Sequence, residues 1–294
     1  MISIIMPAYN EEKNIKKAIE SILNQTNKDF ELIIVNDGSQ DNTVNIVEEF
    51  AAKYKQIIFI NPKKKIGKVS AYNIASKQVS GDWIYFMGAD DTLPLNSFEI
   101  WGNKVDNLDP NKRIALRGRL EVKSNNKKYD GLILPKNKER MNYSGPITLL
   151  SKAMHKFILP IPENLPNEDN WWSLSIKYFA DIQIAVDDIV VYYSIHDGNS
   201  ISRNDSFISF TEKYHRRYLV RDNFINRYKE KLTDKEIQEL KRELICENLR
   251  YNQKSLSVLL MKNINLLTKL RMFMLSAPSL YKIKLRFDRY LLGH

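Results

Sequence analysis

Trp83-Ile84-Tyr85-Phe86-Met87-Gly88-Ala89-Asp90-Asp91 is an apolar run that stops at two adjacent carboxylates, and the fold prediction depends on it. A short apolar run bounded by turn residues is typical of a central strand in a parallel sheet. Open α/β sheets bind ligands at the carboxyl ends of their strands, and carboxylates there suit a divalent cation and a phosphorylated substrate. The alternative is that Asp90 and Asp91 only cap the helix that Pro94 helps to open.

Strand and helix patterns alternate before this stretch. Strand patterns occupy residues 2–6, 30–35 and 57–60, and a helical pattern with an apolar face follows each of them. Such alternation predicts βαβ units and a mostly parallel sheet.

The pattern changes after Pro94. A helix is expected to residue 108, followed by paired strands at 114–122 and 129–134, a short helix starting at Pro146, a helix at 168–179, two strands at 182–186 and 189–195, and only helices from residue 206. We therefore predict an α/β domain at 1–203, with halves 1–92 and 93–203, and a basic α-helical region at 204–294.

Composition narrows the class of protein. Apolar content of 43% and charged content of 27% are ordinary for a globular protein, and the single cysteine, Cys246, fits a reducing compartment. The apolar runs are too short for a spanning helix, and no secretory segment follows Met1, so we expect a cytoplasmic protein. Residues 203–294 hold 20 Lys and Arg against 10 Asp and Glu, which accounts for the whole net charge of +10.

Three predicted strands end in loops rich in hydrogen-bond acceptors. These loops are Pro7-Ala8-Tyr9-Asn10-Glu11, Asn36-Asp37-Gly38-Ser39 and Gly88-Ala89-Asp90-Asp91. In a parallel sheet they lie along one edge, where Tyr9 can stack on a base, Asp37 can accept from a base or ribose, and the third loop can hold a metal on a diphosphate. Each loop alone could equally be a helix cap.

The chain resembles a family 2 glycosyltransferase of the GT-A fold. The resemblance runs over roughly the first 200 residues, through 3–11, 18–25, 31–41, Gly67 with Ala71-Tyr72-Asn73, Gly81-Asp82-Trp83-Ile84 and Asp90-Asp91. It implies a Rossmann-like catalytic domain with a UDP-sugar site lined by Pro7, Ala8, Tyr9, Glu11, Asp37, Gly67, Lys68 and Asp90. It also implies Mn²⁺ or Mg²⁺, with Asp90 as the last carboxylate of the family's Asp-x-Asp motif and Asp91 as a further candidate ligand.

One position departs from the family pattern. The first acidic position of the Asp-x-Asp motif is Gly88 here. Metal binding would then depend on Asp90, Asp91 and water, which Mg²⁺ tolerates when phosphates supply the remaining ligands.

The resemblance makes residues 1–92 the nucleotide-sugar half and 93–203 the acceptor half, and the acceptor half carries two further similarities. Glu168-Asp169 resembles the family's Glu-Asp segment at a helix start, so Asp169 is the candidate base and Glu168, Trp171 and Trp172 are candidate acceptor-binding residues. Ordinary first-turn acids and buried tryptophans are the alternatives. Residues 192–202 resemble the strand and loop that close the family's catalytic half, so His196, where a strand meets a Gly-containing loop, is a candidate metal or diphosphate ligand, and a structural histidine is the alternative.

The last helical segment combines Leu, Met and Phe with basic residues. Residues 269–292 contain six basic residues and one acid, Asp288, a pattern suited to an anionic membrane surface. Packing onto the catalytic domain or onto a second subunit is the alternative, so homo-oligomerisation stays open. No nucleic-acid-binding module is recognisable.

These observations predict an inverting hexosyltransferase that moves a sugar from a UDP-sugar to a glycan, lipid-linked acceptor, peripheral on the cytoplasmic face of the membrane. Two rivals remain: a nucleotidyltransferase that makes NDP-sugars and a non-catalytic nucleotide-sugar-binding scaffold. The first should show a Gly-rich, basic loop where this chain has Ala8-Tyr9-Asn10-Glu11. The sugar, the acceptor and the linkage cannot be read from the sequence.

Overall fold

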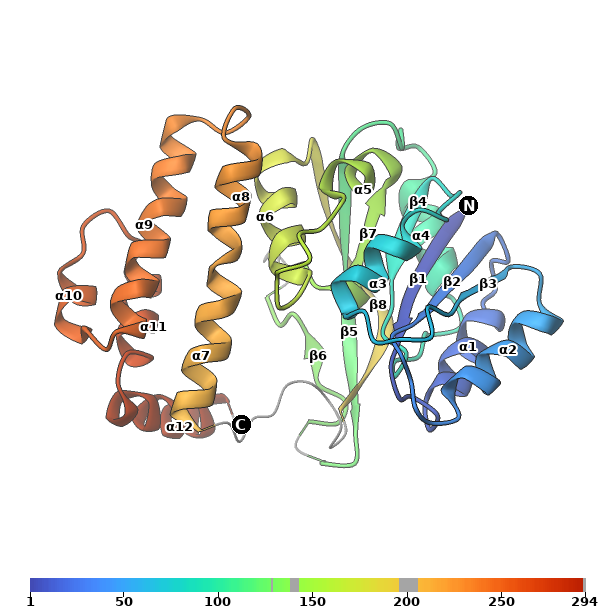
Figure 1. Ribbon diagram of the computed structural model, residues 1–294, viewed down its shortest axis with the longest axis horizontal. Helices are drawn as coiled ribbons and strands as arrows, with labels where there is room; N and C mark the ends of the chain where they lie inside the picture. The colour runs from blue at the N-terminus through green and yellow to red at the C-terminus, as the bar shows by residue number, and fades with distance from the viewer. Residues whose placement is uncertain (128, 138–142, 196–205, 293–294) are drawn as a thin grey trace. The chain divides into compact units, whose positions relative to one another are not determined.

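The computed structural model describes residues 1–127, 129–137, 143–195 and 206–292 (Figure 1). The described residues form two compact units. The first contains the β-sheet and runs to the last strand at Ile195, without the short segment Asn164–Pro166. The second contains that segment and the helices from residue 206.

The first four strands of the sheet are parallel. They are β1 Ile2–Ala8, β2 Phe30–Asn36, β3 Ile57–Ile60 and β4 Trp83–Phe86, arranged in the order β3-β2-β1-β4. The side chains of β4 are buried throughout, as expected for a central strand covered on both faces. The α/β fold predicted from the alternation is confirmed.

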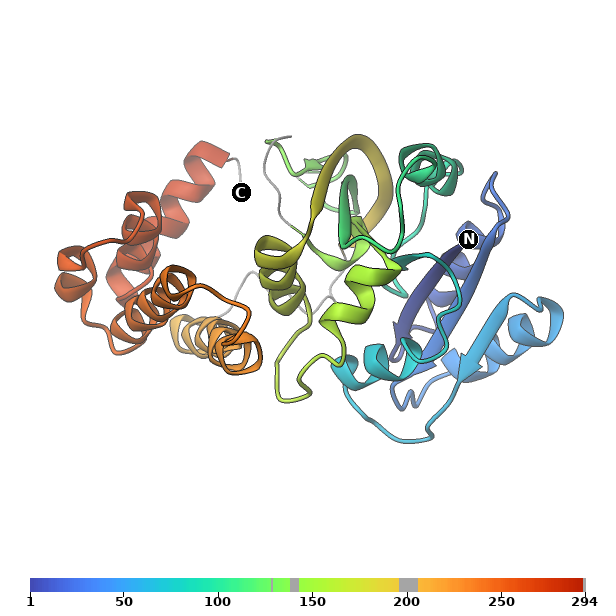
Figure 2. The same ribbon diagram turned by 90° about the horizontal axis from the view of Figure 1, so that it is seen from above.

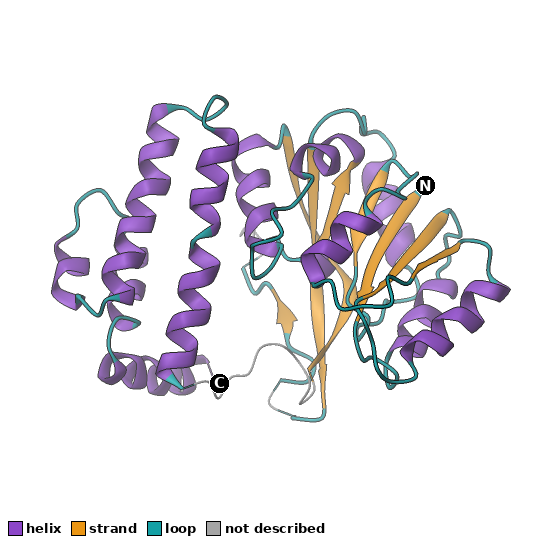
Figure 3. Cartoon of the chain, in the orientation of Figure 1, coloured by secondary structure: helices purple, strands orange, loops and turns teal. Residues whose placement is uncertain are grey.

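The second half of the sheet is mixed (Figure 3). It contains β5 Ile114–Ser124, β6 Ile133–Leu134, β7 Thr148–Ser151 and β8 Ile182–Ile195. β7 pairs antiparallel with both β4 and β5, and β8 pairs parallel with β5. The sequence analysis missed β7 and split β8 in two, because β8 passes the irregular register at Arg119 as one continuous strand.

Six helices lie in the described part of the first unit. They are α1 Ile15–Leu23, α2 Thr43–Lys53, α3 Lys68–Ala75, α4 Ser97–Val105, α5 Lys152–Ile158 and α6 Asp169–Phe179. Residues Gly145–Ile147 form a 3-10 turn at the place of the short helix that was expected to start at Pro146. Neither Asp90 nor Asp91 caps a helix, since α4 starts after Asn96.

The second unit is helical, as predicted. Its described helices are α7 Phe207–Tyr218, α8 Val220–Tyr228, α9 Asp234–Tyr251, α10 Ser255–Leu260, α11 Leu266–Met274 and α12 Pro278–Leu292. Figure 2 shows these helices end-on and from the side. α9 begins with a capping box, in which Thr233 and Glu236 each accept from the other's backbone N–H. Within the described residues, no helix combines the length and the apolar character that crossing a bilayer requires.

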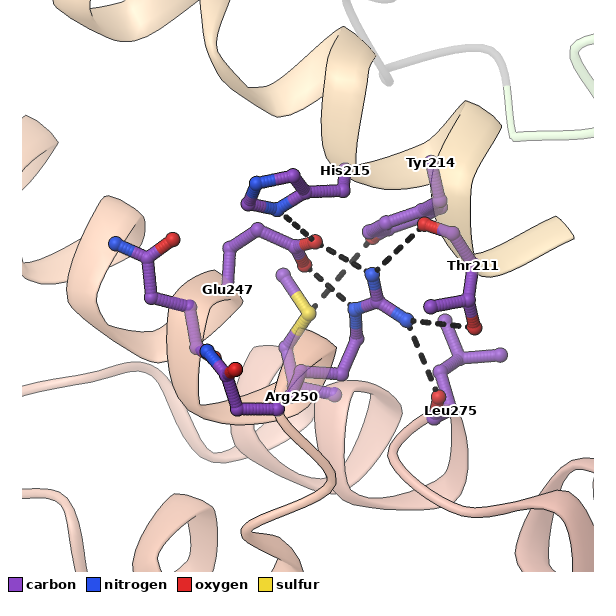
Figure 4. Close-up of polar contacts among 9 residues, drawn as sticks. Thr211, Tyr214, His215, Glu247, Arg250 and Leu275 are labelled. Atoms are coloured by element: carbon purple, nitrogen blue, oxygen red, sulfur yellow. Dashed lines mark hydrogen bonds and ion pairs between the residues drawn. The ribbon is translucent and has the colours of Figure 1, made fainter. Parts of the chain in front are cut away.

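A buried ion pair holds this unit together (Figure 4). The Arg250 guanidinium donates to both carboxylate oxygens of Glu247, at 2.7 Å and 2.5 Å, and both side chains are excluded from solvent. Arg250 also donates to the Thr211 side chain and backbone and to the Leu275 carbonyl, while His215 Nδ1 lies 3.2 Å from Glu247. The network therefore joins α7, α9 and the end of α11.

Replacing Arg250 should destabilise the protein strongly. Arg250→Met leaves the Glu247 carboxylate buried without its charged partner, at an expected cost of about 3–5 kcal/mol in urea unfolding. The matched control is Arg113→Met, because Arg113 pairs with Asp181 at the surface, 36% and 41% exposed. That pair should contribute less than about 1 kcal/mol. Equal costs for the two variants would contradict the assignment of the buried pair.

His155 should make stability fall in acid. Burial lowers the pKa of this α5 histidine to about 3, and its Nε2 lies 3.0 Å from the Ser76 hydroxyl. Below about pH 6.5 the unfolded chain takes up a proton at His155, whereas the folded chain keeps it neutral. Protonation therefore favours the unfolded chain below that pH and has no effect on stability above it.

We expect the wild-type unfolding free energy to decrease by up to about 1.4 kcal/mol per pH unit from this group between pH 6 and 4. His155→Gln should show a correspondingly shallower decrease in the same urea titrations. Identical pH profiles for the two proteins would refute the buried neutral state.

Candidate active site

Strand register places three of the predicted loops at one edge of the sheet. Ala8 at the end of β1 pairs with Asn36 at the end of β2, and Ile5 pairs with Phe86 at the end of β4. The Asp37 N–H donates to the Ala8 carbonyl and the Met87 N–H to the Ile5 carbonyl, which continues the pairing into the loops. Glu11 follows β1, and its N–H donates to the Thr43 hydroxyl at the start of α2.

Asp37 shapes the loop that leads into α3. Its Oδ1 accepts from the backbone N–H groups of Ile66 and Gly67 at 2.7 Å and 2.6 Å. Gly67 has φ +89°, a conformation that favours glycine, and it precedes the first residue of α3, Lys68. Asp37 Oδ1 thus binds the loop backbone, and Asp37 Oδ2 lies 3.9 Å from the Lys65 ammonium.

A cavity of about 430 Å³ opens beside this loop, at the ends of β1, β2 and β3. Tyr9, Asn36, Ser39 and Lys63–Lys65 are among the residues that line it. The Lys65 ammonium lies 2.9 Å from the centre of the Tyr9 ring, so it covers the face on which a base was expected to stack. The sequence analysis did not assign Lys63–Lys65 to the site, because a charge run alone does not show what it faces.

The carboxylates of Asp90 and Asp91 converge over Gly88. A Cβ added at Gly88 would lie 2.6 Å from Asp90 Oδ1 and 2.9 Å from Asp91 Oδ2, so the missing side chain makes room for both. Asp91 is buried and accepts from the Ser194 N–H of β8 at 3.0 Å. Burial raises the pKa of Asp91 well above its usual range, and the neighbouring Asp90 charge raises it further.

The start of α6 contributes the other carboxylates. Asp169 Oδ1 accepts from the Gly145 N–H at 3.0 Å, in the turn before β7. Glu168 is buried, and its Oε1 forms an ion pair with Lys68 at 2.7 Å, while its Oε2 has no hydrogen-bond partner. Lys68, expected to contact a phosphate, thus pairs with a predicted acceptor-binding residue.

Tyr193 on β8 shows how closely these groups gather. Burial raises the pKa of Tyr193 to about 12, together with the charges of Asp91, Asp90 and Asp169 and against that of Lys68. The charges of Asp90 and Asp169, the two ends of the predicted site, therefore both raise the pKa of one tyrosine hydroxyl. Tyr193 lies in the segment that resembles the family's closing strand, but nothing in the sequence singled it out as a site residue.

Trp171 and Trp172 do not form an exposed wall for a sugar ring. Both are completely buried, and Trp171 donates through Nε1 to the Ile158 carbonyl. The Trp172 ring packs 4.1 Å from Phe86 and 5.3 Å from Tyr72 between ring centres. A ring without an exposed face cannot contact a ligand, so these residues position α6 against the end of β4.

His196 lies outside the described residues. Among those described, no three His, Cys, Asp or Glu side chains are grouped in a way that could hold a metal ion by themselves. Two converging carboxylates nevertheless suit a hard cation whose remaining ligands are phosphate and water oxygens, so the chemistry of the site fits Mg²⁺ or Mn²⁺.

Comparison with known proteins agrees with this geometry. The family model described as glycosyl transferase family 2 matches residues 3–154, about half of the chain. The chain belongs to glycosyl transferase family 2. Its residues 3–154 include β1 to β4, both carboxylates after β4 and the antiparallel strand β7.

The chain is similar to curated glycosyltransferases over part of their length. A dolichyl-phosphate beta-glucosyltransferase of Trichomonas vaginalis is 30% identical over 123 residues, 39% of this chain and 38% of that protein. The chain spans 26%, 38% and 40% of the length of three curated relatives that it matches.

Two solved structures share the fold. S. aureus TarS 1-349 in complex with UDP-GlcNAc has a TM-score of 0.62 at 19% identity, over 96% of this chain and 83% of that one. The mannosyltransferase PcManGT from Pyrobaculum calidifontis, in complex with GDP-Man and Mn²⁺, has a TM-score of 0.53 at 15% identity, over 74% and 63%. These similarities confirm the GT-A fold.

Gly88→Ala tests the packing of the two carboxylates. The added methyl group meets Asp90 and Asp91, and Asp91 is buried and held by Ser194, so we expect a loss of about 1–3 kcal/mol in urea unfolding. The matched control is Gly102→Ala in α4, where the new Cβ meets only the Asn27 side chain at 3.5 Å. This change should leave stability equal or slightly higher. Wild-type stability of Gly88→Ala would show that the carboxylates do not close over this position.

Proposed function

We propose that the chain is an inverting glycosyltransferase that moves a sugar from a UDP-sugar to a hydroxyl of a glycan acceptor. One observation carries the proposal: Asp90 and Asp91 converge over Gly88 just after β4, and Asp169 of α6 lies at the same strand end, because a Cβ added at Gly145 would lie 3.8 Å from the Phe86 Cβ and 3.9 Å from Asp169 Oδ1. A carboxylate near a diphosphate-binding edge is the arrangement that single-displacement sugar transfer requires.

The donor would bind at the ends of β1, β2 and β3. Tyr9, Asp37 and Gly67, with Pro7, Ala8 and Glu11 close by in the chain, surround or support the cavity, and its volume lies within the range of small-ligand sites. The fold is shared with TarS, whose structure contains UDP-GlcNAc, and this supports a UDP-sugar as donor. Lys65 would move from the Tyr9 face to let a base stack there.

A divalent cation would bind with the diphosphate. Asp90 and Asp91 would hold it, with His196 as a further ligand, and when bound Mn²⁺ or Mg²⁺ would stabilise the negative charge of the leaving nucleoside diphosphate. Lys68 would add a positive charge from the start of α3, where it already pairs with Glu168.

Asp169 would be the catalytic base. The Gly145 N–H holds one of its oxygens at 3.0 Å, which fixes the orientation of the carboxylate. It would accept the proton of the acceptor hydroxyl as the oxygen attacks the anomeric carbon from the face opposite the diphosphate. One displacement inverts the configuration and needs no covalent intermediate. Glu168 is excluded from solvent and would serve the site indirectly, by holding the Lys68 ammonium through their ion pair.

The acceptor would be lipid-linked. A family relative is named a dolichyl-phosphate beta-glucosyltransferase, which supports a polyprenyl-linked or similar acceptor for this chain. Residues 269–292 are basic and would attach the enzyme to the cytoplasmic face of a membrane.

Asp169→Asn should abolish transfer without abolishing donor binding. A lost general base lowers the rate by roughly 10²–10⁴-fold, whereas UDP affinity measured by calorimetry should be unchanged. The experiment is nucleotide release from UDP-, GDP- and dTDP-sugars, with and without Mn²⁺ and with a glycolipid acceptor. The control is Asp106→Asn, an exposed acid at the end of α4. Full activity of Asp169→Asn, or UDP binding by the wild type without turnover of any donor, would refute the proposal and favour a non-catalytic scaffold.

A further inference from the structure

Five leucines on α10 and α11 are exposed to solvent. Each is between 45% and 76% exposed, and together they are Leu256, Leu260, Leu266, Leu267 and Leu270. We call them the leucine surface. Exposed apolar side chains gathered within fifteen residues of chain are unusual on a monomer and mark an interaction surface.

Helix geometry explains why the leucines face outward. Val258 of α10 and Met272 of α11 are buried with Cys246 of α9 in one apolar cluster. Leu256 and Leu260 lie two residues either side of Val258 and one turn apart, so they share the opposite side of α10. Leu266 and Leu270 are likewise one turn apart on α11, with Met272 on its inner side.

The surface is held on a fixed frame. The Asn265 side chain accepts from the N–H groups of Leu267 and Thr268, which fixes the first turn of α11. α10 and α11 contact each other and α9. In Figures 1 and 2, α10 lies on the side of α9 opposite to α7 and α8, next to α11.

The charged residues of the segment that carries the leucines are all positive. Between Glu247 and Asp288 the sequence contains no acidic residue and, after the buried Arg250, seven basic ones. Lys254 and Lys262 flank α10, and both are exposed, as is Arg271 of α11. Apolar side chains on a segment whose own charges are all positive match the acyl chains and phosphates of an anionic bilayer.

We infer that the leucine surface docks on an anionic lipid bilayer, with its leucines inserted at the boundary of headgroups and acyl chains and Lys254, Lys262 and Arg271 on the lipid phosphates. The inference rests on the proposed lipid-linked acceptor and places the membrane contact mainly on α10 and the first turn of α11. A second copy of the chain is a poorer occupant. A two-fold contact through this surface would bring the same basic residues of both copies together without any acid to pair them.

The test is co-sedimentation of the full chain with vesicles. We expect binding to vesicles of phosphatidylcholine and phosphatidylglycerol, weakened by salt, and little binding to phosphatidylcholine alone. Leu267→Ala should weaken binding to the mixed vesicles on the order of tenfold, and Leu266→Ala/Leu267→Ala further. Lys262→Gln should weaken it about fivefold.

Leu95→Ala is the matched control, because Leu95 is 61% exposed in the first unit and should not alter vesicle binding. The substituted side chains are exposed, and unchanged thermal unfolding would confirm that each variant folds. Three results would overturn the inference: no binding of the wild type, equal binding of the double leucine variant, or a wild-type dimer in light scattering that Leu267→Ala converts to monomer.

Vesicle binding is measured without donor or acceptor, so its outcome is separate from that of the transfer assay. Vesicle binding with no turnover would refute the proposed function alone. Transfer to a water-soluble acceptor fragment with no vesicle binding would refute the docking surface alone. The leucine variants should keep wild-type transfer to that soluble fragment.

Discussion

The contact between the Phe86 and Trp172 rings, 4.1 Å apart between centres, joins the two halves of the sheet unit at the point where β4 ends. Phe86 is the last residue of β4, and Trp172 lies one turn into α6. Because both rings are buried, α6 cannot slide or turn without opening the core. The first residue of α6, Asp169, is therefore held near the carboxylates that follow β4.

A second connection holds the other side of the site. The buried Asp91 accepts from the Ser194 N–H, and Thr92 and Tyr192 exchange two backbone hydrogen bonds. The end of β8 is thus fastened to the loop after β4, and it brings Tyr193 into the site. Aromatic packing on one side and backbone pairing on the other hold the candidate site residues in position. Such preorganisation favours the transition state because little reordering remains to be done.

The helical unit buries an ion pair in its interior and exposes leucines on its surface. Inside, Arg250 and Glu247 are removed from water and satisfy each other, which ties α7 to α9 at the expense of desolvation. Outside, α10 and α11 leave leucines in water beside lysines that have no acidic neighbour in sequence. The interior pair fixes the unit, and the exterior leucines are the part of it that we infer meets a bilayer.

The sequence by itself determined the parallel strands β1 to β4, the helices between them, the helical end of the chain and the edge of the sheet where Asp37 and Asp90 lie. These features follow from local periodicity and turn residues, which short segments carry independently. The carboxylate pair at Glu168 and Asp169 was also visible, but only as a motif at a helix start.

Tertiary structure alone decided the rest. β7 is only four residues long, and it is stabilised by pairing with β4 and β5, which lie far away in the chain. A local sequence pattern therefore does not predict it. The same reason applies to Lys65 over Tyr9 and to the burial of Trp171 and Trp172, since side-chain exposure depends on what packs from elsewhere. The role of Gly88 also became clear only from the structure. The sequence showed a missing carboxylate of the Asp-x-Asp motif, whereas the structure shows that the carboxylates of Asp90 and Asp91 occupy the space of the missing Cβ.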